Sequence, residues 1–258
     1  MKITMLGCGT SVGVPTVGPA GWGRCDPNNK RNYRQRCAVL VEKDDFVVLI
    51  DAGPDIRHQL LSHDVKKIDA LLITHTHSDH IAGLDELRPY YFNKRERIPV
   101  YATAHDLDIL RERFNYLFFK SSDSPTYFQP VLHGMPIEAD SVFNLGGLDI
   151  RTLLQFHGRV TSLGFVFDGR FGYSTDVVDM PEEAFDHLKN LDLWIVEMLR
   201  DEPHQAHAHF ALTMQWIERC TPELAYLTHL GLESDYDSVL AKCPKGVEPG
   251  YDGLTITL

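Results

Sequence analysis

The sequence predicts an α+β fold with a core of two sheets. Short apolar segments alternate with helical segments along all 258 residues, and two kinds of segment occur twice. Phe46–Asp51 resembles Arg170–Asp176, because each is a strand that ends in an aspartate. Ala70–His75 resembles Ala225–His229, because each is a strand that ends in Thr-His. A duplicated half-domain of this kind would place both sets of polar residues at one edge of the two sheets.

The first half begins with an expected strand, Lys2–Leu6, which ends at a Gly-Cys-Gly sequence. Residues 10–37 then form a loop that contains several glycines and prolines, and loops of this length in a compact domain are often functional. Two strands, Ala38–Glu42 and Phe46–Ile50, flank a Lys-Asp-Asp turn. The other elements of this half are expected at 54–62 (helix), 70–74 (strand), 84–97 (helix), 100–102 (strand) and 106–119 (helix).

The second half continues in the same style. Its strands are expected at 150–156, 162–167, 171–174, 193–197 and 224–228, and its helices at 181–188 and 213–220. No Ser/Pro-rich linker or low-complexity segment divides the chain. We therefore expect a single domain over residues 1–258.

The composition excludes several classes of function. The net charge of −11, from 36 acidic and 25 basic residues, argues against binding to extended nucleic acid, because phosphate backbones need a basic surface. The five cysteines include no Cys-x-x-Cys pair, which is atypical of a disulfide framework and suits a reducing cytosol. No segment approaches the roughly 18 to 20 apolar residues that span a bilayer. We expect a cytoplasmic protein that binds no membrane.

Residues 75–80, His-Thr-His-Ser-Asp-His, are the most informative segment of the chain. Four side chains that can bind a metal follow directly after the apolar strand expected at 70–74. Imidazole and carboxylate ligands suit zinc, iron or manganese. A strand that ends in such a run can aim several ligands at one point beyond its C-terminal end, so we expect a metal site here.

Residues elsewhere in the chain are candidates to complete this site. His157, Asp176 and His229 each follow an expected strand, and each taken singly could equally be a polar strand end. Asp51 is either a carboxylate that orients a ligand histidine or a cap of the Ala-Gly-Pro-Asp segment that follows it, and we favour the first.

The order and spacing of these residues resemble the metallo-β-lactamase superfamily, and the match covers nearly the whole chain. The resemblance implies a four-layer αββα sandwich, in which two mixed sheets are flanked by helices and a two-metal site lies at one edge. It assigns His75, His77 and His157 to one ion. It assigns Asp79, His80 and His229 to the second ion, with Asp176 as the bridge.

A two-metal centre of this composition is expected to attract anions. Two carboxylates contribute about −2 and two divalent ions +4, so a bridging hydroxide leaves the centre near +1 inside an acidic protein. Such ions lower the pKa of bound water and stabilise negative charge. Zinc and manganese are both compatible with these ligands, and the sequence does not separate them.

Two further segments resemble the phosphodiesterase branch of the superfamily, which includes ribonuclease Z and the phosphoribosyl 1,2-cyclic phosphate phosphodiesterases. They are Met5–Pro15 and His80–Arg88. The resemblance implies hydrolysis of a small phosphodiester, such as a cyclic phosphate of ribose or a nucleotide, and a homodimer. The long loop departs from this pattern because it offers only Cys25 before the strands, and no histidine closely follows His229. We therefore expect no structural zinc.

His209 matches the position of a catalytic histidine in this branch. We therefore expect His209 to donate a proton to the leaving group, and we expect Asp79 to act in catalysis as well. The alternative is a surface histidine before a helix that Thr213 caps. His204 and His207 are expected to be solvated.

Basic residues are candidates to bind the substrate. The segment 24–36 has five basic residues and one aspartate, a local charge of +4, and it is either a phosphate-binding or a solvated loop. The residues that we single out are Arg34, Arg36, Arg88 and Arg159.

Three rival functions remain open. Ribonuclease Z-like RNA processing would need a basic docking surface, which the net charge disfavours. The same metal centre could instead hydrolyse a thioester, lactam or lactone. The third rival is a non-catalytic metal-binding or redox module, which the complete ligand set disfavours.

Overall fold

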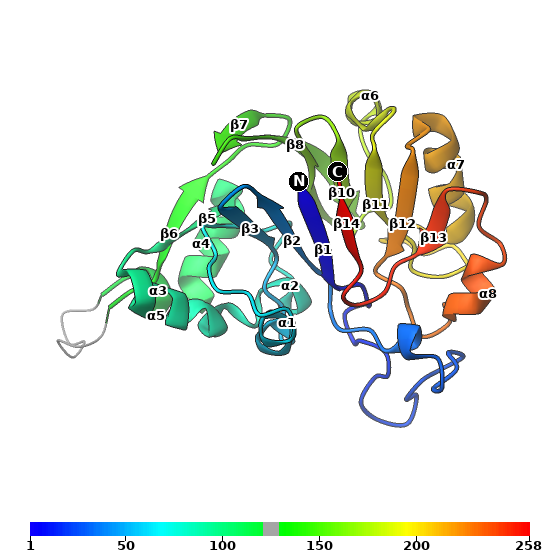
Figure 1. The fold of residues 1–258 in the computed structure, drawn as a ribbon, viewed down its shortest axis with the longest axis horizontal. Coiled ribbons are helices and arrows are strands. Elements are labelled where there is room, and N and C mark those ends of the chain that lie inside the picture. The colour runs from blue at the N-terminus through cyan, green and yellow to red at the C-terminus, as the bar shows by residue number, and fades with distance from the viewer. Residues whose placement is uncertain (121–128) are drawn as a thin grey trace.

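Two seven-stranded sheets pack face to face in the computed structural model, which describes residues 1–120 and 129–258 (Figure 1). The first sheet has the order β14 (Thr255–Thr257), β1 (Lys2–Gly7), β2 (Ala38–Lys43), β3 (Phe46–Ile50), β4 (Ala70–Leu72), β5 (Ile98–Ala102) and β6 (Leu132–Pro136). The second sheet has the order β13 (Val247–Pro249), β12 (Leu224–Thr228), β11 (Leu193–Glu197), β10 (Phe171–Ser174), β9 (Val160–Phe167), β8 (Leu148–His157) and β7 (Val142–Leu145).

The two sheets have the same topology. In the first, antiparallel pairs connect β14 to β3 and parallel pairs connect β3 to β6. In the second, antiparallel pairs connect β7 to β10 and parallel pairs connect β10 to β13. β3 therefore corresponds to β10, as the similarity of their sequences predicts. The counterpart of β4 is β11 rather than β12, so the Thr-His similarity joins strands that are not equivalent.

Strands β2, β3 and β4 are buried on both faces, and this explains their nearly continuous apolar sequences. Val39, Val41 and Val48 pack against the second sheet in the core between the sheets. The alternate residues Leu40 and Leu49 pack against the helices. Strands covered on both faces show this composition, because neither face meets water.

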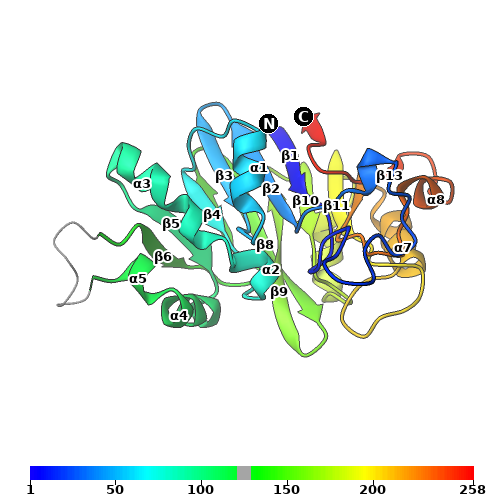
Figure 2. The same cartoon turned by 90° about the horizontal axis from the view of Figure 1, so that it is seen from below.

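Helices cover the outer faces of both sheets (Figure 2). Those beside the first sheet are α1 (Ile56–Ser62), α2 (Ser78–Ile81), the 3₁₀ turn η2 (Leu84–Leu87), α3 (Arg88–Lys94), α4 (Ala104–Arg113) and α5 (Asn115–Phe118). Those beside the second sheet are α6 (Glu182–Leu188), α7 (Phe210–Cys220) and α8 (Tyr236–Leu240). This is the predicted sandwich of two mixed sheets between two helical layers. Among the described residues, no helix has the length and apolar character needed to cross a membrane.

The observed elements differ from the predicted ones mainly where signals are weak. The helix expected at 106–119 is two helices, because the backbone leaves the helical conformation at Phe114. Sequence reasoning missed β6, whose sequence Leu-His-Gly-Met-Pro lacks a strand signature, and the short strands β13 and β14. It also missed β7 and α8.

Candidate metal centre

The predicted ligand loop, residues 75–80, follows the C-terminal end of β4 in the first sheet. Its backbone is extended at His77, which is the residue before the first turn of α2. The segment after β3 packs directly against this loop, and Ala52 N donates a hydrogen bond to His80 O over 2.7 Å. A Cβ atom on Gly53 would lie 1.9 Å from Asp79 O, so only glycine permits this approach. The segment that follows β3 therefore packs against the loop and holds it in place.

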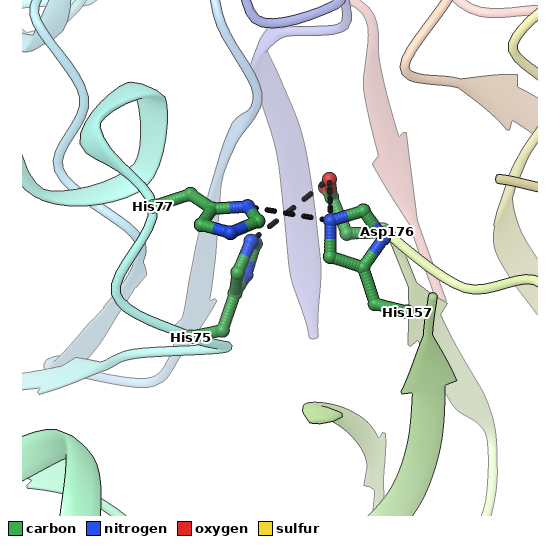
Figure 3. A group of neighbouring side chains, drawn as sticks. All are labelled: His75, His77, His157 and Asp176. Atoms are coloured by element: carbon green, nitrogen blue, oxygen red, sulfur yellow. Dashed lines mark hydrogen bonds and ion pairs between the residues drawn. The ribbon is translucent and has the colours of Figure 1, made fainter. Parts of the chain in front are cut away.

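The first ligand group contains His75, His77, His157 and Asp176 (Figure 3). Each offers one ligand atom, and these atoms all lie within 4.8 Å of one another. His157 Nε2 lies 3.3 Å from His77 Nδ1 and 3.6 Å from Asp176 Oδ1. Two ring nitrogens that face each other at this distance can both bind one cation.

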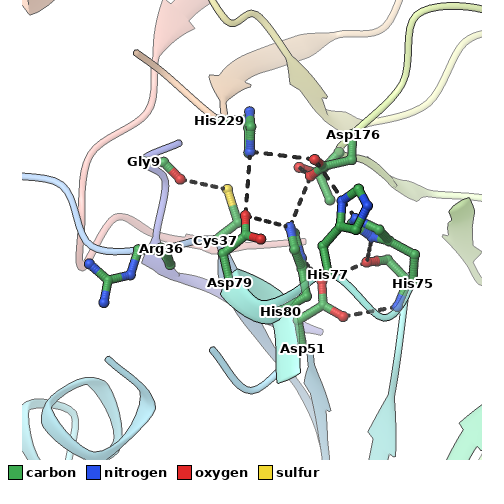
Figure 4. Close-up of polar contacts among 12 residues, drawn as sticks. Gly9, Arg36, Cys37, Asp51, His75, His77, Asp79, His80, Asp176 and His229 are labelled. Atoms are coloured by element: carbon green, nitrogen blue, oxygen red, sulfur yellow. Dashed lines mark hydrogen bonds and ion pairs between the residues drawn. The ribbon is translucent and has the colours of Figure 1, made fainter. Parts of the chain in front are cut away.

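The second group contains Asp79, His80, His229 and Asp176 (Figure 4). His80 Nε2 lies 3.0 Å from Asp176 Oδ2 and 3.2 Å from Asp79 Oδ2. His229 Nε2 lies 3.5 Å from Asp176 Oδ1. Asp176 thus belongs to both groups, and its two oxygens face different ligands. The structure brings together all seven residues that the resemblance assigned to two metal ions.

The donor set fits divalent metal ions. The Nε2 atoms of His75, His80 and His229 are buried and have no hydrogen-bond partner within residues 1–120 and 129–258. Buried polar atoms are almost always satisfied, so orphaned nitrogens that converge on carboxylates indicate that a cation completes the site. Five imidazoles and two carboxylates are a ligand set that zinc or manganese accepts.

Hydrogen bonds behind the ligands fix which ring nitrogen faces the centre. His80 Nδ1 donates to Asp51 Oδ2 over 2.7 Å, and Asp51 also accepts from Thr74 N and Thr74 Oγ1. His157 Nδ1 donates to Ala206 O over 2.7 Å. In both rings Nε2 is left as the ligand atom, which is the usual arrangement around a bound metal. Asp51 occupies the orienting position that we favoured for it.

Glu197 and His207 belong to the same cluster, and sequence reasoning missed both. Glu197 is fully buried at the end of β11, accepts from His207 Nδ1 over 2.5 Å, and lies 3.1 Å from His229 Nδ1. The His207 ring stacks on that of His229 with 4.8 Å between centroids. The expectation that His207 is solvated is therefore wrong. A carboxylate that ends an apolar strand, as Glu197 does, was the available sequence signal.

Three residues of the centre have an unusual backbone conformation. Asp51, Asp176 and His229 have φ angles of 62°, 52° and 56°. Side chains other than glycine rarely adopt this left-handed region, and residues held in it gather at functional sites. Asp51 and His229 directly follow strands, and Asp176 follows one residue later, so each strand end turns sharply as it delivers its side chain.

The two groups differ in electrostatics. Burial and the neighbouring His80 hold the pKa of His75 well below its ordinary value, and burial also lowers the pKa of His157. Burial opposes the charged form of His80 and His229 as well, but the adjacent carboxylates, Asp176 foremost, outweigh it and raise both pKa values well above normal. In the metal-free protein, protons therefore occupy the second group in preference to the first.

Comparison with known proteins identifies the family. A family model described as a β-lactamase superfamily domain matches residues 47–230. The chain belongs to this superfamily. The superfamily includes hydrolases, and its fold implies divalent metals, in agreement with the His/Asp groups observed here.

Three known proteins are similar to most of the chain. A diphosphatase of the PhnP family has a crystal structure with a TM-score of 0.89 and 30% identity, over 99% of this chain and 96% of that one. An octanoyltransferase from Porphyromonas gingivalis is 32% identical over 98% of this chain and 51% of its own length. A ribonuclease Z from Haloarcula marismortui is 28% identical over 65% of this chain and 47% of its own length. The chain thus spans about half the length of these curated relatives.

The four arginines predicted to bind substrate differ in burial and in their contacts. Arg34 is only 1% exposed, and it donates to Ser234 O over 2.7 Å and to Asn32 Oδ1 over 3.1 Å. It joins the long N-terminal loop to the segment after His229, so its prediction as a substrate-binding residue is wrong. Cys25 Sγ lies 3.9 Å from the Arg34 guanidinium, within the same cluster.

The other three arginines are accessible to different degrees. Arg36 forms an ion pair with Asp55 over 3.0 Å, and its guanidinium points away from the ligands (Figure 4). Arg88 is the first residue of α3 and is not among the residues that line the cavity beside His77. Arg159 is exposed and does line that cavity.

His209 is the last residue before α7 and is partly exposed. Its backbone is extended, with φ −110° and ψ 165°, and it follows Ala208, whose side chain is fully buried. The residue before α7 is His209, so Thr213 does not cap this helix; it lies in the helix interior, where its hydroxyl donates to Glu197 O over 2.7 Å.

Proposed function

We propose that this chain is a dinuclear-metal hydrolase of small phosphodiesters, either cyclic phosphates of ribose or a nucleotide, or diphosphate diesters. The observation that carries the proposal is the pair of ligand groups that share Asp176. Such a pair suits in-line displacement at phosphorus, in which attacking and leaving oxygens both need charge stabilisation. Similarity to a diphosphatase over nearly the full length of both chains supports a phosphorus centre.

The residues of the chain have separate tasks in this reaction. Two bound divalent ions would supply an activated water and positive charge against the phosphoryl oxygens. Asp51 and the Ala206 carbonyl hold the rings of His80 and His157 in the ligating orientation. His209, the last residue before α7, is the proposed proton donor to the departing alkoxide.

A metal-quantified assay tests this function. The purified protein would be assayed with bis(p-nitrophenyl) phosphate, a 2′,3′-cyclic nucleotide and a diphosphate diester. We expect turnover that chelation abolishes and that metal restores. Asp79→Ala should lose turnover without unfolding, whereas Asp45→Ala, an exposed residue of the β2–β3 turn, should retain it. Turnover of none of the three phosphate esters by the metal-loaded protein would refute the proposal.

Acyl hydrolysis is the second candidate function, and one observation favours it. The chain is similar over 98% of its length to half of an octanoyltransferase, whose name describes acyl transfer. A thioester and a lactam would therefore be assayed in parallel. Turnover of either, with inert phosphate esters, would assign the chain to carbon rather than phosphorus chemistry.

A further inference from the structure

A chain of buried polar side chains runs from β8 across β9 to the backbone on either side of Asp176. Gln155 on β8 and Ser162 on β9 are paired directly opposite each other, so their side chains share one face of the sheet. Their exposed fractions are 0% and 2%. Burial of a polar group costs free energy unless the group is hydrogen-bonded, so the partners of these two side chains indicate their role.

The hydrogen bonds of this chain have a fixed direction. Gln155 Nε2 donates to Ser162 Oγ and to Thr175 O, each over 3.0 Å. Since Thr175 O can only accept, the amide nitrogen must face it. Ser162 Oγ in turn donates to Asp176 O over 2.8 Å. Because Ser162 Oγ accepts from the amide, its single proton points to Asp176 O, and bonds in such a chain strengthen one another.

Both peptide groups that flank the Cα atom of Asp176 are therefore held. Thr175 O belongs to the peptide group before this atom, and Asp176 O belongs to the one after it. In the second peptide group, Val177 N also donates to Glu197 Oε2 over 2.5 Å. The orientation of the two peptide planes sets φ and ψ at Asp176, where φ is 52°. These angles fix the direction of the Cα–Cβ bond, and thus where the carboxylate lies.

A glycine provides the space that this chain needs. Gly164 lies two residues after Ser162 on β9, so both positions face the same side of the sheet. A Cβ atom on Gly164 would lie 2.5 Å from Gln155 Oε1 and 3.2 Å from Tyr173 O. Any other residue at this position would displace the amide, so Gly164 allows the Gln155 side chain to cross β9.

We propose that Gln155 and Ser162 are positioning residues that hold the carboxylate of Asp176 where both ligand groups can share it. They act through the backbone of Asp176 rather than through its carboxylate. The left-handed conformation is unfavourable for an aspartate, so without these bonds the residue would relax and withdraw its carboxylate from the two groups. The inference rests on the proposed function, because it concerns the ligand that the two metal ions have in common.

Metal binding tests this role without any substrate. Ser162→Ala removes the hydrogen bond to Asp176 O, and Gln155→Met removes the one to Thr175 O with little change in volume. We expect the zinc affinity of both ligand groups to fall about fivefold in each variant, the effect of losing one hydrogen bond. Competition with a chelator would measure it. The absorption spectrum of bound Co²⁺ depends on the ligands around the ion, so it should change for both ions.

Thr152→Val is the matched control. Thr152 lies on the same strand as Gln155 and is 0% exposed. Its hydroxyl donates to Glu138 O over 2.7 Å and accepts from Ser141 N over 2.9 Å, so this variant also loses one donated and one accepted hydrogen bond. It should lower the melting temperature about as much as Ser162→Ala does. The zinc affinity and the Co²⁺ spectrum should stay as in the wild type.

Several results would overturn the positioning role. They are an unchanged zinc affinity in Ser162→Ala and Gln155→Met, a loss confined to one ion, and an equal loss in Thr152→Val. Unfolding of both test variants under conditions in which Thr152→Val folds would also overturn it, because the chain would then support the fold rather than the carboxylate. Failure of the proposed function would appear separately, as diesters that the zinc-loaded wild type leaves intact.

Discussion

Asp176 is the residue on which both ligand groups depend. It is 2% exposed, its Oδ2 faces His80, and its Oδ1 faces His157 and His229. A residue that belongs to only one group, such as His77, lies near the ligand atoms of that group alone. Loss of the Asp176 charge should therefore affect both ions, and loss of His77 only one.

Asp176→Asn tests this difference at a single residue. Asparagine tolerates the left-handed conformation, so the change removes the charge with little backbone strain. We expect metal content to fall at both positions and turnover to fall by more than about 100-fold, which exceeds the usual effect of losing an orienting partner. Metal analysis after dialysis would measure it. His77→Ala, as the comparison, should retain about one ion per chain, and equal losses in the two variants would contradict the shared role.

His209 should behave differently, because it belongs to neither ligand group. His209→Ala should lower turnover by roughly 10²- to 10⁴-fold with metal content unchanged, since a proton donor acts on the leaving group only. Substrates with good leaving groups, such as p-nitrophenyl esters, should lose less than alkyl esters. Loss of metal in this variant would show that His209 is a ligand, and an equal loss for both kinds of ester would exclude a proton donor.

Helix α4 connects the ligand loop to the cavity wall. Thr76 lies between the ligands His75 and His77, and α4 holds it at two points. Its hydroxyl donates to Asp106 at the start of the helix, and its carbonyl accepts from Arg113 Nη1 over 2.8 Å at the end. A single helix thus positions the loop that carries half of the first ligand group.

Asp106→Asn tests this bracing. The amide is a weaker acceptor for the Thr76 hydroxyl, and one hydrogen bond is worth about 1 kcal/mol. We expect the metal affinity of the first group to fall about fivefold, with the second group unchanged. Asp108→Asn, an exposed position on the same helix, is the control and should change neither affinity. Competition with a chromophoric chelator would measure both, and equal weakening of the two groups would argue against a local effect.

The metal content of the whole molecule should depend on pH in two stages. A histidine binds a metal only when neutral, so a raised pKa hinders binding and a lowered pKa favours it. As pH falls, His80 and His229 take up protons first, because their pKa values are raised. The second group should therefore release its ion at a higher pH than the first, where the pKa values of His75 and His157 are lowered.

Two variants separate the stages. His229→Asn leaves the first group intact and tolerates the left-handed backbone, whereas His77→Ala leaves the second group intact. After dialysis over a series of pH values, His229→Asn should keep its ion to lower pH than His77→Ala. The opposite order would contradict the electrostatic difference between the groups.

Across the molecule, the sequence predicted the ligands better than their surroundings. His75, His77, Asp79 and His80 lie within six residues, so a local pattern reveals them. The more distant candidates follow apolar strands, and the family resemblance assigned them to the site. Arg34 was misassigned because its burial depends on a carbonyl 200 residues away, at Ser234. Such a contact leaves no trace in local composition.

The sandwich itself was predicted from the family resemblance. The sequence did not predict that Glu197 and His207 belong to the site, because their contact joins the end of a strand to a distant loop. Short edge strands such as β13 and β14 are held by pairing with neighbours rather than by their own sequences.

The left-handed backbone at Asp51, Asp176 and His229 also constrains how this chain can diverge. A descendant that no longer bound metal would be free to discard the three side chains but would still need the same sharp turns after its strands. Drift at these positions should then favour glycine and asparagine over branched or bulky residues. Glycine or asparagine at all three positions would mark a lineage that keeps this fold after losing its chemistry.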